Sequence, residues 1–322
     1  MSDKIIELLI KNNILSDKKQ LVPITVGAGG ASVFSVADKY VVKYANLSTL
    51  DFETRKQYRN EFDFYQICSN KNFDFIPEVI FQTSYDDEML IIMKKYIPIK
   101  VEEWDENLQK SAMELCANIN AVDTTDFISI FQDHDKKIAN ANDGDDKGED
   151  PYPLSLSYQN WVNLQKKFPE HIDAVLLKEM YENFDNIDIY TGKQTIPETL
   201  CHGDYHPQNF LKNGDKLIIC DWQAVGIGKG IGDIAFFISR GIDMGLKVDR
   251  DKLIADYYEA LLKYTNIKVD VYDLHKNVAA NEFGVSFRFW AHYLENSDID
   301  RVLNIYNAMV KSYGLLLRKK LY

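Results

Sequence analysis

The sequence predicts an α+β fold, with a small β-rich lobe at residues 1–97 and a larger, mainly helical lobe at residues 98–322. Two observations support this prediction. Short runs rich in β-branched and aromatic residues dominate the N-terminal part of the chain. After Pro98, apolar residues recur instead at the three- and four-residue spacing of amphipathic helices. The chain has 322 residues and is 46% hydrophobic, which is ample for a packed core.

Two β-hairpins joined by a helix are predicted in the N-terminal lobe. Residues 33–45 contain two β-rich runs on either side of a turn at 37–39, and residues 78–97 repeat this design around a turn at 86–87. Between the hairpins, the aromatic and aliphatic residues of segment 51–70 fall at helical spacing, which predicts one helix.

Amphipathic helices are predicted in the C-terminal lobe at residues 108–122, 253–262 and 302–313, where apolar residues share one helical face. Segment 134–153 has almost no apolar residues, so a surface loop is expected there. No internal repeat interrupts this order of elements.

The net charge of −12 limits the partners of this chain. Binding to DNA or RNA phosphates needs a basic surface, so the charge argues against nucleic acid as a main partner. An acidic surface suits a cationic small substrate, but it also serves simply to keep a protein soluble. The sequence indicates no particular oligomeric state.

A cytoplasmic location without a membrane partner is expected. No apolar run reaches the ~18 residues of a membrane span, and the N-terminal segment has no signal-peptide cleavage pattern. The cysteines form no metal-type pair, which is typical of reduced thiols. They are Cys68, Cys116, Cys201 and Cys220.

A glycine-rich segment lies at residues 26–36. Gly27, Gly29 and Gly30 permit positive φ angles and a close approach of a ligand to the backbone. A glycine-rich turn between two strands can present backbone N–H groups to phosphate oxygens. The same pattern also occurs in hairpins that bind nothing, so by itself it leaves phosphate binding open.

Lys43 lies within an apolar strand, thirteen residues after Gly30. Its side chain would either extend outward to solvent or face a site. In a cleft the ammonium would need a negative partner. Glu61, in the predicted helix, could supply that charge, and Glu53 is the competing candidate.

The segment 201–222, CHGDYHPQNFLKNGDKLIICDW, carries the densest group of candidate catalytic residues. Residues 217–220 form a short apolar strand, so Asp221 is expected at a strand end. Asn209 and Asp221 supply the hard oxygen ligands that Mg²⁺ prefers. Asp204 remains as a carboxylate that can accept a proton from an attacking hydroxyl. Together with the glycine-rich segment and the lysine, this set fits phosphoryl transfer.

Two alternatives remain for this segment. Asp204 and Asn209 are also common turn formers ahead of a hairpin. A zinc site made by Cys201, His202 and His206 is the other alternative, although no second cluster completes four ligands. His202 is expected to bond to the backbone near the loop rather than to take part in catalysis, and His206 either touches substrate or has no role.

The motif HGDYHPQNF followed by IICDWQ resembles the catalytic and metal motifs of the aminoglycoside phosphotransferase and choline kinase-like family. These are small-molecule kinases with a protein-kinase-like, two-lobe fold. The resemblance implies Asp204 as the catalytic base, Asn209 and Asp221 as magnesium ligands, and ATP or GTP as the phosphate donor. It also implies that Lys43 binds phosphates and that Glu61, in NEFDFYQI, is its partner.

Other positions take their expected roles from the same resemblance. Ser32 stands where protein kinases usually have a third glycine, and the stretch from Met93 to Tyr96 would form the interlobe connection that touches the adenine. Asp233, in VGIGKGIGDIAFFI, is similar to a structural aspartate that caps a helix and braces the catalytic loop. Asn120 stands where the family usually has a histidine.

Departures from the protein-kinase pattern favour a small-molecule acceptor. Gly203 takes the place of the arginine in the HRD motif, and no activation loop ends in an APE-like motif. The resemblance covers residues 22–240 and fades beyond them, in the part that commonly shapes the acceptor site in this family. The acceptor is therefore the property that the sequence predicts least well.

The predicted function is a kinase that uses ATP or GTP with Mg²⁺ to phosphorylate a hydroxyl of a small molecule. A metal-dependent hydrolase could use the same acids, but it would not need the glycine-rich segment or Lys43. A degenerate kinase fold that only binds nucleotide is the non-enzyme alternative. The acceptor classes are an aminoglycoside-like antibiotic, choline or another amino alcohol, and an uncharged metabolite or sugar alcohol.

An amino alcohol would need an aromatic cage for its ammonium group. Phe287, Phe289, Trp290 and Tyr293 could provide one. A helical stripe of core aromatics explains the same four residues.

Overall fold

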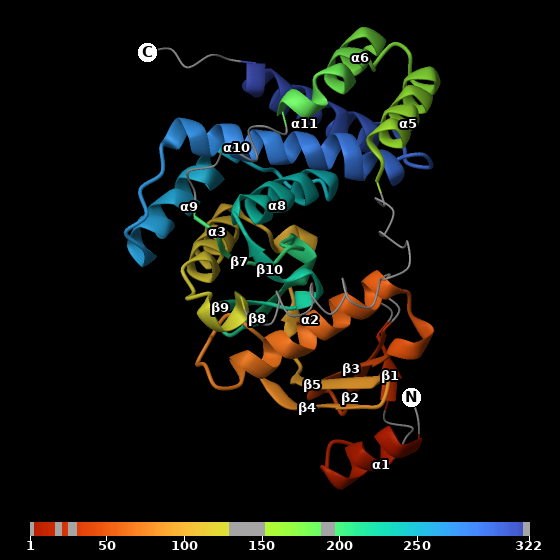
Figure 1. Ribbon diagram of the computed structural model, residues 1–322, viewed down its shortest axis with the longest axis vertical. Helices are drawn as coiled ribbons and strands as arrows, with labels where there is room; N and C mark the ends of the chain where they lie inside the picture. Colours follow the sequence, from red (N-terminus) through yellow and green to blue (C-terminus); the bar gives the residue numbers. More distant parts are fainter. Residues whose placement is uncertain (1–2, 17–20, 25–30, 129–151, 188–196, 318–322) are drawn as a thin grey trace, which may run out of the picture. The chain divides into compact units, whose positions relative to one another are not determined.

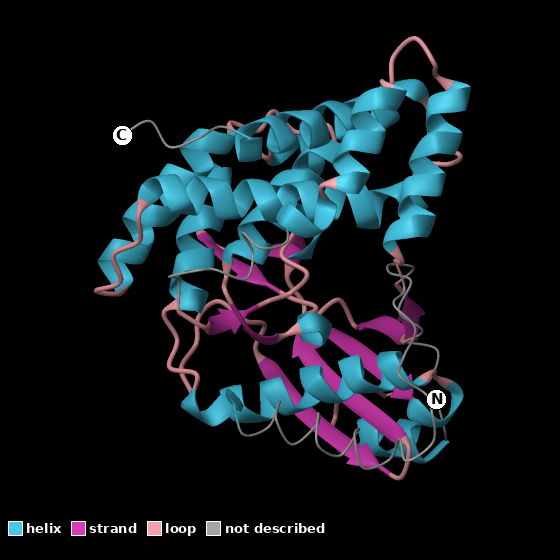
Figure 2. Cartoon of the chain, turned by 45° about the horizontal axis from the view of Figure 1, so that its top comes forward, coloured by secondary structure: helices cyan, strands magenta, loops and turns pink. Residues whose placement is uncertain are grey.

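The computed structural model describes residues 3–16, 21–24, 31–128, 152–187 and 197–317. The chain forms two compact units. The first consists of residues 1–99, 125–143 and 209–226, and the second of residues 100–124, 144–208 and 227–322. Most strands belong to the first unit and most helices to the second (Figures 1 and 2). The predicted α+β class is therefore confirmed.

An antiparallel sheet forms the centre of the first unit. Its strand order is β1-β2-β3-β5-β4. The strands are β1 (Leu21–Pro23), β2 (Ser32–Val36), β3 (Tyr40–Asn46), β4 (Val79–Tyr85) and β5 (Glu88–Lys94). Both predicted hairpins are present as β2–β3 and β4–β5. Ala37 and Asp38 have positive φ angles in the first turn and Asp86 in the second, as tight hairpin turns require.

The two faces of this sheet carry different helices. Helix α1 (Asp3–Lys11) packs on the face that includes Val42 and Leu90. Helix α2 (Phe52–Cys68) contributes to a cluster with Ala45 and Met89, on the other face. Alternation along β3 places Lys43 on the same face as Ala45. The strand period therefore turns Lys43 toward α2.

A second, smaller sheet explains why a late segment of the chain joins the first unit. Strand β6 (Ile97–Pro98) pairs with β8 (Phe210–Asn213), and β8 pairs with β9 (Lys216–Ile219). The predicted lobe boundary after residue 97 lies close to the point where the chain leaves the first unit, after residue 99. Nothing in the sequence indicated that residues 209–226 belong to that unit.

The second unit is built mainly from α-helices. They are α3 (Glu106–Asn120), α5 (Leu154–Lys167), α6 (Ala174–Glu182), α8 (Ile231–Asp243), α9 (Arg250–Tyr264), α10 (Val271–Gly284) and α11 (Ile299–Leu317). The predicted helices correspond to α3, α9 and α11. Two short strands, β7 (Thr199–Cys201) and β10 (Gly226–Gly228), pair with each other. In the part of the chain that the structure describes, no helix is long and apolar enough to cross a membrane.

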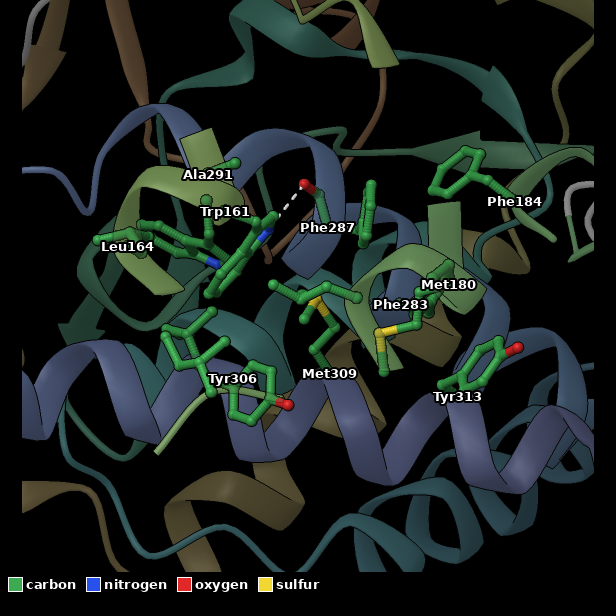
Figure 3. Packing of buried hydrophobic residues seen from close by; sticks show 14 of the residues in the cluster. Trp161, Leu164, Met180, Phe184, Phe283, Phe287, Ala291, Tyr306, Met309 and Tyr313 are labelled. Atoms are coloured by element: carbon green, nitrogen blue, oxygen red, sulfur yellow. Dashed lines mark hydrogen bonds between the residues drawn. The ribbon is translucent and has the colours of Figure 1, made fainter. Parts of the chain in front are cut away.

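The core of the second unit lies among α5, α6, α10 and α11 and includes the π-helical turn Val285–Phe289 (Figure 3). Trp161 is fully buried there and donates a hydrogen bond from Nε1 to the carbonyl of Phe287 at 3.1 Å. Full burial of a large apolar side chain contributes about 1.5–3 kcal/mol. Helix α8, which carries Asp233, packs against α10 and α11 and is held on this core.

Candidate active site

Lys43 lies between two carboxylates within the first unit. Its Nζ atom is 2.6 Å from Oε2 of Glu61 and 2.8 Å from Oδ1 of Asp221. Glu61 comes from the buried face of α2, and Asp221 lies two residues beyond the end of β9. The predicted ion pair of Lys43 with Glu61 is present, so Glu61 rather than Glu53 is the partner. We refer to Lys43, Glu61 and Asp221 as the lysine trio.

Burial and charge act in opposite directions on the trio. Burial by itself lowers the pKa of the Lys43 ammonium, but the carboxylates of Glu61 and Asp221 together raise it above its ordinary value. Burial raises the pKa of Glu61, which the charge of Lys43 opposes. The Glu61 side chain is 1% exposed and that of Asp221 is 41% exposed. Asp221 is therefore the carboxylate that a ligand can reach.

An aromatic stack holds α2 against the segment that carries Asp221. The ring of Phe64, one helical turn after Glu61, lies 4.2 Å from the ring of Trp222, with 17° between their planes. Trp222 is fully buried and donates from Nε1 to the carbonyl of Ile219 at 2.9 Å. We assigned no role to this stack from the sequence. The available signals were a tryptophan directly after Asp221 and an aromatic residue three positions after Glu61.

Asn209 and Asp221 flank the same end of the β8–β9 hairpin. Phe210 pairs with Ile219, and the N–H of Cys220 donates to the carbonyl of Asn209 at 2.9 Å. One amide oxygen and one accessible carboxylate fit Mg²⁺, which takes few protein ligands beside phosphates. With both carboxylates ionised, the lysine trio carries a net charge of −1, which also suits a bound cation.

The loop that carries Asp204 lies in the second unit and is held by Asp233. The carboxylate of Asp233 accepts hydrogen bonds from the backbone N–H groups of His202, at 2.8 Å, and Gly203, at 2.9 Å. Gly203 has a φ of 81°, a conformation that glycine adopts without steric cost. Asp233 thus braces the loop, as the family resemblance implied.

Asp233 differs from expectation in one respect. The N-cap of α8 is Gly230, and no side chain caps the helix, because both oxygens of Asp233 are used by the loop. Burial raises the pKa of Asp233 from 3.8 to about 6, against the effect of its two hydrogen bonds and with a smaller contribution from the charge of Asp204. The helix-capping role implied for Asp233 was therefore wrong.

The histidines of the loop contact Asp204 from both sides. Nδ1 of His202, which is buried, accepts from the backbone N–H of Asp204 at 3.2 Å. Nε2 of His206 lies 3.4 Å from Oδ2 of Asp204. The Asp204 side chain is 39% exposed, so its carboxylate is accessible to a substrate. His202 bonds to the backbone as predicted.

Asn120 braces the strand that precedes this loop. Its Nδ2 donates to the carbonyl of Leu200 and its Oδ1 accepts from the hydroxyl of Tyr257, both at 2.8 Å. Gly230, with a φ of +68°, packs so closely that an added Cβ would lie 2.4 Å from Oδ1 of Asn120. The N–H of Gly230 donates to Sγ of Cys201 at 3.2 Å. These contacts give Cys201 a structural role that does not require zinc.

The remaining predicted nucleotide-binding residues are placed only in part. Gly27, Gly29 and Gly30 lie outside the described residues, as does most of segment 134–153. Ser32 begins β2, beside the strand pair Val33–Lys43. Met93 is buried in β5 on the same sheet face as Lys43. The hydroxyl of Tyr96 accepts from the backbone N–H of Glu78 at 3.3 Å. Nucleotide contacts of these residues stay predictions.

The aromatic stretch around Trp290 is mostly core. Phe287 and Trp290 are buried in the core of the second unit. Nε1 of Trp290 donates to Oγ of Ser239 at 2.7 Å. The guanidinium groups of Arg240 and Arg301 lie 5.1 and 5.6 Å from the centre of its ring. The π surface that would attract a substrate ammonium therefore already has cations of the protein beside it.

A β-rich unit with a paired lysine and a helical unit with a braced aspartate loop are the components of a protein-kinase-like phosphotransferase. The family described as "Phosphotransferase enzyme family" matches residues 21–266. This chain belongs to that family and is a phosphotransferase, which confirms the predicted enzyme class. Among curated proteins, none matches the chain in a sequence comparison.

Solved structures with the same fold include aminoglycoside phosphotransferases and choline or ethanolamine kinases. The GDP complex of wild-type aminoglycoside 2'-phosphotransferase-IIIa has a TM-score of 0.59 at 14% identity, covering 97% of this chain and 98% of that chain. Choline kinase from Cryptosporidium parvum Iowa II has a TM-score of 0.56 at 13% identity, covering 98% and 95%. Plasmodium vivax ethanolamine kinase has a TM-score of 0.58 at 12% identity, covering 95% and 85%. At these identities the likeness shows the fold.

Proposed function

We propose that this phosphotransferase is a kinase that transfers the γ-phosphate of ATP or GTP to a hydroxyl of a small, cationic acceptor such as an aminoglycoside-like antibiotic. The observation that carries the proposal is the lysine trio. A buried lysine held by a buried glutamate is the arrangement that presents a fixed ammonium to nucleotide phosphates. A hydrolase acting through the same acids would have no need of it.

The phosphate donor would be held by groups of the first unit. Lys43 would balance the charge of the phosphates, and Glu61 would keep its ammonium in place. Backbone N–H groups around Gly27, Gly29, Gly30 and Ser32 would cover the phosphates, and Met93 and Tyr96 would lie near the base. Asn209 and Asp221 would hold Mg²⁺, which when bound supplies positive charge against the phosphate oxygens.

Asp204 would act on the acceptor. Its accessible carboxylate would accept the proton of the attacking hydroxyl. The contacts of Asp204 with His202 and His206 support this role, because they fix the position of the loop and of the carboxylate. Asp233, which holds the loop backbone, would keep that geometry before the acceptor arrives.

Two observations bear on the class of acceptor. The net charge of −12 favours a cationic acceptor through long-range attraction. Solved structures of the same fold include a gentamicin complex and a streptomycin–ATP complex of APH(2")-IIa. An amino alcohol is the second candidate, because choline and ethanolamine kinases share the fold. The burial of Phe287 and Trp290 weakens it, since only Phe289 and Tyr293 of the suggested cage retain exposed surface.

The deciding experiment is a screen of purified protein with Mg²⁺ and either ATP or GTP. The acceptor sets are aminoglycosides, amino alcohols and uncharged sugar alcohols, and release of nucleoside diphosphate is followed together with the mass of each acceptor. We expect an aminoglycoside-type acceptor to gain a phosphoryl group. Nucleotide hydrolysis without a phosphorylated product would support the hydrolase alternative, and nucleotide binding without turnover would support a degenerate binding module.

A further inference from the structure

Tyr58 is a buried residue of the first unit that the proposed mechanism does not use. It is on α2, one turn before Glu61, so both side chains share one face of the helix. Its side chain is 4% exposed and packs with Ala45, Leu47 and Met89. A buried tyrosine normally needs a partner for its hydroxyl. The hydroxyl of Tyr58 has two such partners, Ala31 and Gln223.

The hydroxyl of Tyr58 joins two segments that are far apart in the sequence. It accepts a hydrogen bond from the backbone N–H of Ala31 at 2.8 Å. Ala31 lies in the glycine-rich segment 26–36, directly after Gly30 and before β2. The side chain of Gln223 hydrogen-bonds to the same oxygen, and Gln223 stands two residues after Asp221.

The ring of Tyr58 contacts Lys43. Nζ of Lys43 lies 5.5 Å from the ring centre, within the range of a cation–π interaction. Burial raises the pKa of Tyr58, so the hydroxyl stays neutral near pH 7. One side chain therefore contacts Ala31, the lysine of the trio, and the segment that follows Asp221.

We propose that Tyr58 is a positioning residue that couples Ala31, directly before β2, to the Asp221 segment, so that both are in place before nucleotide binds. The proposal rests on the proposed nucleotide-binding function of the first unit. Ala31 directly precedes Ser32, whose backbone is proposed to cover the phosphates. Without the hydrogen bond, ordering the backbone at Ala31 would have to occur on nucleotide binding, and affinity would fall.

The test removes the hydroxyl group of Tyr58. Tyr58→Phe keeps the ring beside Lys43 and the core packing, but it removes the acceptor used by Ala31 and Gln223. The matched control is Tyr65→Phe, on the same helix. Tyr65 is equally buried, and its hydroxyl has no hydrogen-bond partner among the residues that the structure describes. Binding of Mg·ATP and Mg·GTP is measured by calorimetry for wild type and both variants.

We expect Tyr58→Phe to raise the nucleotide Kd about two- to tenfold, the usual worth of one hydrogen bond, and Tyr65→Phe to leave it unchanged. With the acceptor found in the screen, the nucleotide KM should rise by the same factor while kcat stays within about twofold. If Tyr58 only supported the core, its replacement would lower the melting temperature without raising the nucleotide KM selectively over kcat.

Four results would contradict one of the two proposals. If wild type binds neither nucleotide, the proposed function fails. If wild type binds but Tyr58→Phe binds equally well, or if Tyr65→Phe weakens binding as much, the coupling role fails. Gln223→Leu supplies an independent check, because it removes the other side of the coupling. Its effect on the Kd should be less than additive with that of Tyr58→Phe, and strict additivity would contradict the proposal.

Discussion

The lysine trio and the Asp204 loop hold their polar groups by different means. In the trio, side chains hold side chains, and Lys43 divides its contacts between Glu61 and Asp221. In the loop, the carboxylate of Asp233 holds the backbone ahead of Asp204. An ion pair can rearrange when another ion arrives, whereas a loop bonded through its backbone keeps its shape. The first arrangement is therefore suited to respond to a charged ligand, and the second to present Asp204 unchanged.

The largest effect is expected on kcat, from replacing Asp204. Asp204→Asn should lower kcat about 10²–10⁴-fold, because the amide cannot accept the hydroxyl proton. The nucleotide Kd should change little, because the groups proposed to bind the phosphates do not include Asp204. Steady-state kinetics and calorimetry on the same preparation measure both quantities. Asp185→Asn, at an exposed position in the same unit, is the control. A kcat within a few-fold of wild type would remove Asp204 from the mechanism.

The next effect tests whether the trio acts as a unit. Lys43→Ala should lower kcat/KM about 10²–10³-fold, as losing one charge-stabilising group typically does. Glu61→Ala should cost about tenfold, because it removes only the partner that orients the lysine. The double variant should lose far less than the product of the two, because Glu61 acts through Lys43.

Glu53→Ala is the matched control for Glu61→Ala, since Glu53 is an exposed glutamate in the first turn of the same helix. It should leave kcat/KM unchanged. If Glu53→Ala reproduces the loss and Glu61→Ala does not, the trio seen here has no catalytic meaning.

The Asp204 loop should also make the stability of the protein depend on pH, through Asp233. The folded state raises the pKa of Asp233 from 3.8 to about 6, so it binds this proton more tightly than the unfolded chain does. The resulting stabilisation is fully present below about pH 3.8, declines as the pH rises to about 6, and is absent above that. It amounts to at most about 3 kcal/mol.

Chemical denaturation between pH 3.5 and 7 would measure this (roughly the window in which the carboxyl titrates). The free energy of unfolding of wild type minus that of Asp233→Asn should fall with rising pH and become flat above about pH 6. A flat difference throughout would show that Asp233 is ionised in the folded state over the whole range.

The smallest expected effect concerns the aromatic stack under the trio. Phe64→Leu should lower the free energy of unfolding by about 0.5–1.5 kcal/mol beyond the loss of buried area. It should also weaken nucleotide binding, since it loosens α2 against Trp222. Phe73→Leu, which breaks the Phe73–Phe75 stack at 4.8 Å, is the control for a lost ring pair in the same unit. Equal nucleotide affinity in both variants would show that the stack supports folding only.

Local patterns predicted the parts of the fold that depend on local geometry. Strand alternation and helical spacing located both hairpins, α2, and three helices of the second unit. They left the partner of Lys43 open between Glu61 and Glu53, and the family resemblance favoured Glu61, which the structure confirms. The family motif placed Asp204, Asn209 and Asp221 around one loop and hairpin, and their chemical roles stay proposals.

Local patterns could not predict the contacts between segments that are distant in the sequence. The pairing of β6 with β8 brings residues 97–98 to residues 211–212, and neither strand has more than four residues to give a periodic signal. The stack of Phe64 on Trp222 and the hydrogen bond from Ala31 to Tyr58 are likewise tertiary contacts. The π-helical turn at Val285–Phe289 was not predicted either, because its apolar residues fit an ordinary helix equally well.

The close approach of Gly230 to Asn120 has a consequence for how this sequence can change. An added Cβ at position 230 would lie 2.4 Å from Oδ1 of Asn120, and the backbone there has a φ of +68°. Any side chain at position 230 therefore meets both a steric and a conformational barrier. In a library randomised at both positions, glycine should be recovered at 230 wherever asparagine stands at 120. Asparagine at 120 should be replaced only by residues that still satisfy Leu200 and Tyr257, so the first position tolerates one residue and the second a short list.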